Sequence, residues 1–207
     1  MSDAARRRSS WRPRGAEVVG IDVAFRWLVI GKKRLEQEGV RATLVAACAE
    51  ALPFRDDIFD VVTMQSALEV LRDQATALGE SHRVLRARGE LLVSTPNRLS
   101  IGPDPHVGVY GGGLLPWPLV SAIARLKMAR PPLRHLLSTV GLRRALRAAR
   151  FTDVRTAIPS LSESQRAQFR GLAGTLAGLY ERARTMPVAR SMLSIIGPLL
   201  QARGTKP

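Results

Sequence analysis

Short apolar runs alternate with segments of helical periodicity along the first half of the chain. The runs over 17–22 and 42–47 are rich in apolar and β-branched residues, which is typical of buried parallel strands. Between them, residues 25–37 repeat apolar positions at helical spacing, and Gly39 stands where a helix would stop. This pattern predicts a strand–helix–strand unit.

The alternation continues through the middle of the chain. Residues 52–57 predict a turn-rich loop, 59–64 a third strand, 73–85 an amphipathic helix, and 90–95 a fourth strand that Pro96 stops. Strands that alternate with helices indicate an α/β fold with a Rossmann-like, mostly parallel sheet. Right-handed crossovers place the carboxyl ends of such strands at one edge, where ligands of open α/β sheets bind.

The pattern changes beyond Asn97. Residues 99–118 carry many glycines and prolines, and an irregular loop of this length is usually functional or mobile. Helices are predicted over 119–128 and 139–150, followed by a late strand over 151–158. Two further helices are predicted, over 162–184 and 188–200.

These elements divide the chain into three parts. Residues 1–14, rich in Arg and Ser, predict a disordered basic arm. Residues 15–159 form the predicted α/β domain, and residues 160–207 a C-terminal helical extension. The mixed apolar and basic residues of 188–200 leave two interpretations open: an interfacial membrane helix, or a helix that packs on the domain or on a dimer partner.

Composition narrows the class of protein. With 207 residues and 45% hydrophobic residues the chain can bury one core, and no apolar run approaches the roughly 20 residues of a membrane span. The single Cys48 excludes an internal disulfide framework and a multi-cysteine zinc site, and the three separated histidines argue against a metal centre. Without a secretory signal pattern, we expect a cytoplasmic location.

The net charge is +15, which favours anionic partners such as a phosphorylated substrate or a membrane surface. The arginines are spread along the chain, and an overall compositional bias explains them equally well. Only 5% of residues are aromatic and none interleaves with a basic block, so we do not expect a nucleic-acid partner.

Three motifs in order carry a family resemblance. The chain reads GAEVVGID, then ACAEALPFRDDIFDVVTMQSALEVL, then SHRVLRARGELLVSTPN. This succession resembles strands two to five of the class I S-adenosylmethionine (SAM)-dependent methyltransferases, over roughly residues 15–159. The resemblance implies a class I methyltransferase fold, S-adenosyl-L-methionine as cofactor, and methyl transfer to a small-molecule acceptor.

One member of that set is missing. The family's glycine-rich loop, which ends strand one and approaches the cofactor's amino-acid end, has no counterpart before Gly15, where the chain reads MSDAARRRSSWRPR. Without strand one we expect a gap beside the strand 17–22, with unpaired backbone groups. A truncated gene product and a degenerate paralogue that has lost donor binding both explain this departure.

The resemblance assigns cofactor roles to residues at the strand ends. Asp22 ends the first predicted strand, where a carboxylate can accept both hydrogen bonds from a ribose diol, and Val23 follows it. A helix-capping role explains Asp22 equally well from position alone. Cys48 stands where the family has the Asp that binds the adenine amino group, and Ala49 and Glu50 complete that segment. A thiol is a poor acceptor, so only the backbone contact from Ala49 is expected to survive.

Two further residues complete the expected site. Gln65 ends the strand-four motif beside the expected methyl donor, and His106 lies in the glycine- and proline-rich loop. His106 is a candidate general base for an acceptor hydroxyl, although a loop histidine facing solvent is the more common case. In-line methyl transfer rests mainly on proximity and orientation, so it needs no dedicated acid–base motif.

Two hypotheses about function follow. The first is a SAM-dependent methyltransferase that acts on a small molecule. The second is a truncated or degenerate, non-catalytic methyltransferase-like protein that acts as a partner or as a module for anionic surfaces. The missing loop, Cys48, and Val70 in place of the family's usual His favour the second.

Overall fold

The structure, a computed structural model, describes residues 15–102, 104, 107–127, 134–160 and 172–207. The predicted disordered arm therefore lies outside the described residues. The first unit consists of strand β1 (Val19–Asp22), helix α2 (Phe25–Gln37) and strand β2 (Thr43–Ala46). Gly39 adopts a φ of 60° and its N–H bonds to the carbonyl of Glu36, so it ends α2 as the sequence predicts.

The second unit contains the long strands. It comprises β3 (Phe59–Gln65), a 3₁₀ turn η2 (Leu68–Val70), helix α3 (Gln74–Val84) and β4 (Leu85–Pro96). Asp73 caps α3, because its carboxylate accepts hydrogen bonds from the N–H groups of Ala75 and Thr76. The capping bonds start the helix one residue after the predicted boundary.

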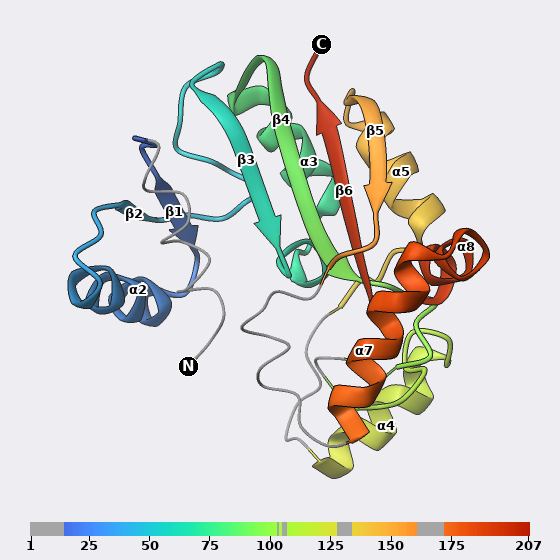
Figure 1. The fold of residues 1–207 in the computed structure, drawn as a ribbon. Coiled ribbons are helices and arrows are strands. Elements are labelled where there is room, and N and C mark those ends of the chain that lie inside the picture. Colours follow the sequence, from blue (N-terminus) through green and yellow to red (C-terminus); the bar gives the residue numbers. More distant parts are fainter. Residues whose placement is uncertain (1–14, 103, 105–106, 128–133, 161–171) are drawn as a thin grey trace.

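The second half of the chain returns to the same sheet. Its elements are α4 (Trp117–Lys127), α5 (Thr139–Ala148), β5 (Thr152–Ala157), α7 (Leu172–Thr185), α8 (Pro187–Ile196) and β6 (Leu199–Thr205). Among the described helices, none combines the length and apolar content that a membrane crossing needs. Figure 1 shows α7 and α8 near the end of the sheet where β3 and β4 finish.

The strands form two separate sheets. One contains β1 and β2 in parallel, and the other has the order β3-β4-β6-β5. In the second sheet β3 pairs parallel with β4, whereas β6 runs antiparallel to both β4 and β5. Three of its four strands therefore point the same way, as expected for a Rossmann-like sheet. Among the described strands, β1 and β3 belong to different sheets and do not pair with each other (Figure 1).

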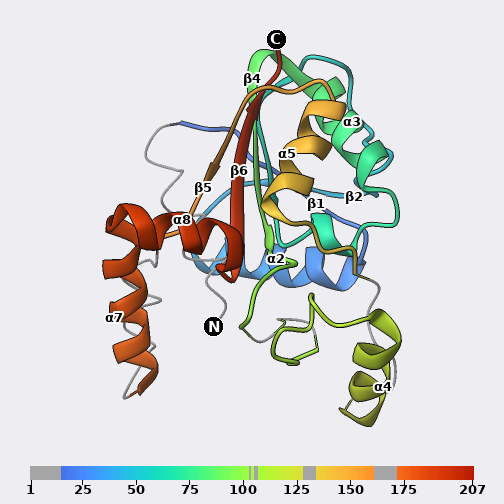
Figure 2. The same cartoon turned by 90° about the vertical axis from the view of Figure 1, so that its right-hand side faces the viewer.

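The main core lies between the four-stranded sheet and two helices. Figure 2 shows α3 and α5 on the same face of this sheet. Leu78 from α3, Leu91 from β4, Leu142 and Leu146 from α5 and Phe151 before β5 are buried together there. The substantial contacts of β1, α2 and β2 are instead with one another. The first unit is thus joined to the main core mainly through the segment after β2.

The C-terminal part requires a correction. Residues 199–205 form β6, which lies between β4 and β5, so residues 160–207 are not a helical extension outside the domain. The helix predicted over 188–200 ends at Ile196, because Gly197 and Pro198 turn the backbone into an extended conformation before Leu199. The sheet is therefore completed by the last residues of the chain.

Candidate functional site

The strands β1, β3 and β4 end toward the same side of the molecule (Figure 1). β1 ends at Asp22, β3 at Gln65 and β4 at Pro96. The sequence predicted this convergence from the parallel α/β alternation, and open α/β sheets bind their ligands at this edge. The candidate site is therefore built from the residues that end these strands.

Asp22 is half-buried at the end of β1. Its Oδ1 accepts a hydrogen bond of 2.8 Å from the N–H of Ala24, which fixes the turn between β1 and α2. Oδ2 has no hydrogen-bond partner among the described residues. The turn uses one oxygen and leaves the other as an acceptor, so the local structural role does not exclude a ligand role. The neighbouring Val23 is 71% exposed.

The segment after β2 is a turn at the same edge. Cys48 is exposed, and its carbonyl accepts from the N–H of Ala51. Ala49 packs against the main core. The carboxylate of Glu50 accepts a hydrogen bond of 3.2 Å from the N–H of Arg72, so Glu50 ties this turn to the segment after β3. Ala49 is the residue through which the turn is anchored on the core.

Two side chains of α3 hold the loop that follows. Glu80 accepts from the N–H of Leu52, while the Arg83 guanidinium donates to the carbonyls of Leu52 and Phe54. Arg83 also pairs with Glu80 and with Asp56, each at 2.7 Å. The hydrogen bond from Arg83 holds the pKa of Glu80 below its usual value. This cluster fixes the backbone between the first unit and β3.

Gln65 ends β3 with an exposed side chain. The next residue, Ser66, has a φ of 50°, and its N–H donates to the carbonyl of Ser94 at 2.7 Å. A non-glycine residue in the left-handed region is strained, and such residues cluster at functional sites. The turn directs the chain away from the sheet immediately after Gln65.

A buried carboxylate lies beneath this turn. Glu69 is fully buried in η2, and its Oε2 accepts a hydrogen bond of 3.0 Å from the hydroxyl of Thr95, which is 1% exposed. The Glu69 carbonyl accepts from the N–H of His135. Sequence reasoning placed Thr95 at a strand end but assigned no role to Glu69. The available signal was an acidic residue inside the otherwise apolar run Leu68–Val70.

Asn97 joins the end of β4 to α8. Its side-chain amide donates to the carbonyls of Ile195 and Gly197 at 2.7 and 2.8 Å, and its oxygen accepts from the N–H of Leu99. Every one of these contacts is to backbone. The Asn97 side chain, at a strand end where cleft residues were predicted, therefore serves as a structural clamp.

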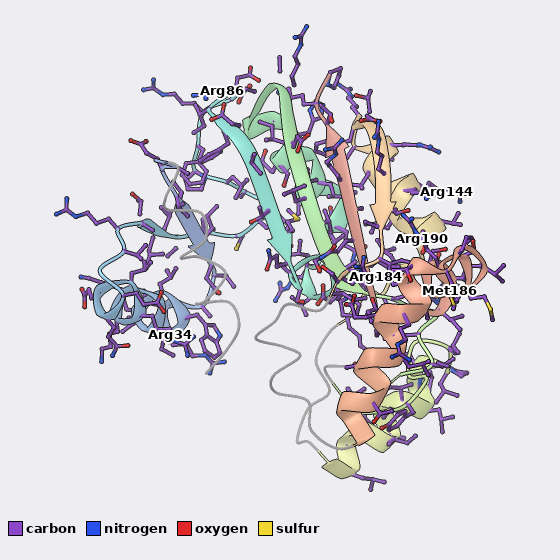
Figure 3. All side chains as sticks on the ribbon, in the orientation of Figure 1. Arg34, Arg86, Arg144, Arg184, Met186 and Arg190 are labelled. Atoms are coloured by element: carbon purple, nitrogen blue, oxygen red, sulfur yellow. The ribbon has the colours of Figure 1, made fainter. Side chains whose placement is uncertain are left out.

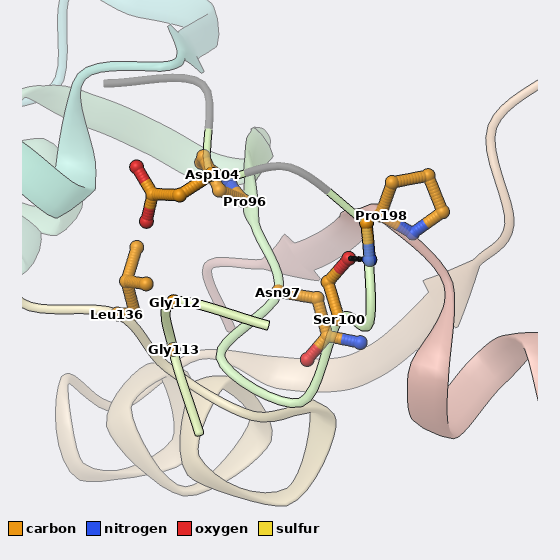
Figure 4. Close-up of a pocket in the computed structure, with 9 residues that line it drawn as sticks. Pro96, Asn97, Ser100, Asp104, Gly112, Gly113, Leu136 and Pro198 are labelled. Atoms are coloured by element: carbon orange, nitrogen blue, oxygen red, sulfur yellow. Dashed lines mark hydrogen bonds between the residues drawn. The ribbon is translucent and has the colours of Figure 1, made fainter. Parts of the chain in front are cut away.

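A small cavity separates this clamp from the loop that follows (Figure 4). Its lining residues are Pro96, Asn97, Ser100, Gly102, Asp104, Gly112, Gly113, Leu136 and Pro198. The space open to a water-sized molecule is about 10 Å³, enough for about one water and too small for a cofactor. A buried ion pair between Arg134 and Asp104 holds the loop beside this cavity. The Arg134 guanidinium also stacks on Trp117, with its Cζ 5.0 Å from the centre of the ring.

The structure therefore brings together only some of the site residues predicted from the sequence. Asp22, Gln65 and the turn Cys48–Glu50 lie at the ends of strands on the same side of the sheets. His106 lies outside the described residues. Within the described part of the chain, no three His, Cys, Asp or Glu side chains gather as metal ligands would.

Comparisons with known proteins agree with the fold. Residues 5–93 match a family model described as a methyltransferase domain. The chain is 40% identical over 100 residues to a demethylmenaquinone methyltransferase of Thermus thermophilus, covering 48% of this chain and 43% of that protein. It is also 40% identical over 81 residues to a ubiquinone/menaquinone biosynthesis C-methyltransferase of Pectobacterium carotovorum, covering 38% and 32%. The chain thus spans less than half the length of these relatives.

Solved structures resemble most of the chain at low sequence identity. A SAM-dependent methyltransferase of Thermotoga maritima, described as a possible histamine N-methyltransferase, aligns with a TM-score of 0.56 and 20% identity over 92% of this chain and 73% of that one. The Haemonchus contortus phosphoethanolamine N-methyltransferase 2, solved with SAM, aligns with a TM-score of 0.60 and 14% identity over 98% and 46%. The predicted resemblance to class I SAM-dependent methyltransferases and the predicted Rossmann-like fold are therefore confirmed.

Proposed function

We propose that this chain, whose residues 5–93 carry a methyltransferase-domain sequence, is a SAM-dependent methyltransferase that acts on a small molecule. The observation that carries the proposal is the Asp22 carboxylate, half-buried at the end of β1 with only Oδ1 engaged by the described residues. One relative is named a demethylmenaquinone methyltransferase, and another a ubiquinone/menaquinone biosynthesis C-methyltransferase. We therefore propose an apolar aromatic acceptor with a carbon nucleophile.

The described residues suit the nucleoside end of the cofactor. Asp22 offers an anionic acceptor for a ribose diol. The N–H of Ala49 has no acceptor among the described residues, so it remains a donor for an adenine ring nitrogen. Cys48 offers only a weak acceptor where the family uses a carboxylate.

SAM held by Asp22 and the N–H of Ala49 would supply an electrophilic methyl group for transfer to an acceptor that gives up a proton. The chain's task is to bind and orient, because proximity and alignment provide most of the rate enhancement in such a transfer. Gln65 has an exposed amide at the end of β3 and is proposed to orient the acceptor. His106 is proposed as the base that takes the proton.

The first test is titration calorimetry with S-adenosylhomocysteine, which measures binding without turnover. Asp22→Asn keeps an oxygen that can accept from the N–H of Ala24, so the turn persists while the negative charge is lost. We expect the affinity to fall roughly tenfold or more, since hydrogen bonds to charged groups contribute about 1.5–3 kcal/mol. The matched control is Asp60→Asn, an exposed carboxylate near the start of β3. Equal affinity for all three proteins would exclude the ribose role.

A second candidate function is supported by the separation of β1 and β3 into different sheets within the described residues, and by Cys48. In this alternative the protein is a non-catalytic, methyltransferase-like partner. Transfer of a radiolabelled methyl group from SAM to a demethylated quinol would support the enzyme. Binding of the cofactor without transfer to any quinol would favour the alternative. A cytoplasmic location remains part of both proposals.

A further inference from the structure

Helix α8 presents an apolar stripe to solvent. Val188, Met192 and Ile195 are 77%, 58% and 54% exposed. They are spaced at i, i+4 and i+7, so they lie on one face of the helix. Met186, immediately before the helix, is 60% exposed. A helix that packs on a core turns such a stripe inward, whereas no residue of α8 is buried.

Hydrogen bonds from Thr139 and Asn97 to the C-terminal part of α8 fix the orientation of this stripe. The carbonyl of Ser194 accepts a hydrogen bond of 2.5 Å from the hydroxyl of Thr139, the first residue of α5. Asn97 binds the carbonyls of Ile195 and Gly197. These bonds hold α8 against the end of β4 and against α5. The helix cannot rotate its apolar stripe toward the protein without breaking them.

Cationic side chains accompany the stripe. Figure 3 shows Arg144, Arg184 and Arg190 on the same side of the molecule as Met186. Arg144 comes from α5, Arg184 from the end of α7, where it pairs with Glu181, and Arg190 from α8 itself. Neither α5 nor α8 contains an acidic residue. We call these three arginines together with Met186, Val188, Met192 and Ile195 the α8 face.

We propose that the α8 face docks on the surface of an anionic lipid bilayer. Arg190, two residues after Val188, lies on the opposite side of α8 from the stripe. An apolar helix face with arginines on the polar side and on neighbouring helices is the pattern of a helix that lies in the interface, with apolar side chains at the acyl boundary and cations at the lipid phosphates. Charge complementarity selects this occupant: α5 and α8 are purely cationic, and the whole chain carries a net charge of +15. A nucleic acid would leave the central apolar stripe without a partner.

Docking in this way places the carboxyl end of β4, one of the strand ends that form the candidate site, close to the membrane. The residues that end β4 and α8 are bonded directly to each other through Asn97. An apolar methyl acceptor dissolved in the bilayer would then meet the edge of the sheet without crossing bulk water. This consequence rests on the proposed function, whereas the docking itself does not.

The test is sedimentation of the full chain with vesicles. Vesicles of phosphatidylglycerol mixed with phosphatidylcholine are compared with vesicles of phosphatidylcholine alone. We expect binding to the anionic vesicles that weakens as salt is added, and a roughly tenfold or greater loss for Met192→Asp and for Arg190→Glu. The matched controls are Leu126→Asp, which alters an exposed leucine on α4, and Lys33→Glu, which makes the same charge change on α2.

Several outcomes would overturn the proposal. One is equal binding by Met192→Asp and wild type, and another is an equal loss in Leu126→Asp. A dimer that Met192→Asp dissociates, without vesicle binding by the wild type, would identify a second copy as the occupant. In a second measurement, lipids with brominated acyl chains should quench the tryptophan fluorescence of the Met192→Trp variant more than that of the wild type, which has three Trp residues. Equal quenching of the two proteins would contradict insertion. These variants should bind S-adenosylhomocysteine with unchanged affinity. Cofactor binding without vesicle binding would contradict the docking proposal while leaving the proposed function intact.

Discussion

The hydroxyl of Thr95 donates a hydrogen bond of 3.0 Å to the carboxylate of Glu69, and both side chains are excluded from solvent. The bond links the last part of β4 to the 3₁₀ turn that follows β3. It therefore joins two of the strand ends from which the candidate site is built. A buried acceptor of this kind loses stabilisation when its donor is removed.

Replacing Thr95 with valine tests the contribution of this bond. Thr95→Val keeps the shape of the side chain but removes the donor, and we expect the free energy of unfolding to fall by about 1–3 kcal/mol. Urea unfolding measures the change. The control is Thr63→Val, an exposed position on β3, which should change stability by less than about 0.5 kcal/mol. Equal stability of the two variants would contradict the role assigned to the pair.

Asn97→Ala tests the clamp between β4 and α8. The substitution removes the donor from two backbone carbonyls that are shielded within the protein. We expect a loss of about 2–6 kcal/mol in unfolding free energy, because each of the two unsatisfied carbonyls costs about 1–3 kcal/mol. Limited proteolysis should also cut sooner near α8. Cleavage at the wild-type rate, together with unchanged unfolding, would show that other contacts hold the helix.

Arg83→Met tests the cluster that fixes the loop after β2. Arg83 contacts two carbonyls and two carboxylates, and its side chain is 31% exposed. We expect a loss of about 1–3 kcal/mol in urea unfolding, since several partners lose their donor together. Arg86→Met is the matched control, because Arg86 makes one exposed pair with Asp60 and such pairs contribute about 0–1 kcal/mol. Similar losses of unfolding free energy in both variants would show that the Arg83 cluster contributes no more than an exposed surface ion pair.

His82 predicts a pH dependence of stability. Its ring packs edge-on against Phe151 and its Nε2 is buried without a hydrogen-bond partner in the described residues. Burial lowers the pKa of His82 below its usual value of 6.5, and the charges of Lys206 and Arg150 lower it further. Between the lowered pKa of the folded state and pH 6.5 the unfolded chain therefore binds more protons at His82 than the folded chain, so stability falls as pH falls through this window.

The comparison of wild type with His82→Phe isolates this effect. Between pH 7 and pH 5 the wild type should lose stability more steeply than the variant, by less than about 1.4 kcal/mol per pH unit. Urea unfolding at a series of pH values measures both slopes. Parallel curves would mean that the histidine titrates alike in the folded and unfolded chain.

The sequence predicted the elements whose signals are local. Helix α2 has the predicted bounds of Phe25–Gln37, and the strands predicted over 17–22, 42–47, 59–64 and 90–95 correspond to β1 to β4. β4 begins earlier than predicted, at Leu85, which the pattern assigned to the preceding helix. The strand β6 was missed because the helical pattern over 188–200 extends across its first residues. The pair Gly197-Pro198 was the local signal that separates the two elements.

The candidate site likewise contains residues that local sequence predicts and residues that it does not. The position of Asp22 at a strand end is local information, so it could be predicted. The partner of Asn97 could not, because Ile195 is 98 residues away and the bond is made to its backbone carbonyl. The bond between Thr95 and Glu69, 26 residues apart, likewise depends on how β4 packs beside η2. Such contacts follow from the tertiary arrangement, which periodicity does not encode.

The separation of the β1–α2–β2 unit from the four-stranded sheet has a consequence for local unfolding. The substantial contacts of these three elements are with one another, while β4 has a strand on each side. Two paired strands alone are only marginally stable, and this unit adds one helix but few contacts with the main core. Amide protons of β1 and β2 should therefore exchange with deuterium through a low-energy opening that leaves β4 protected. Asp22 lies in this unit, so ligand binding at that residue would be coupled to the unit's order.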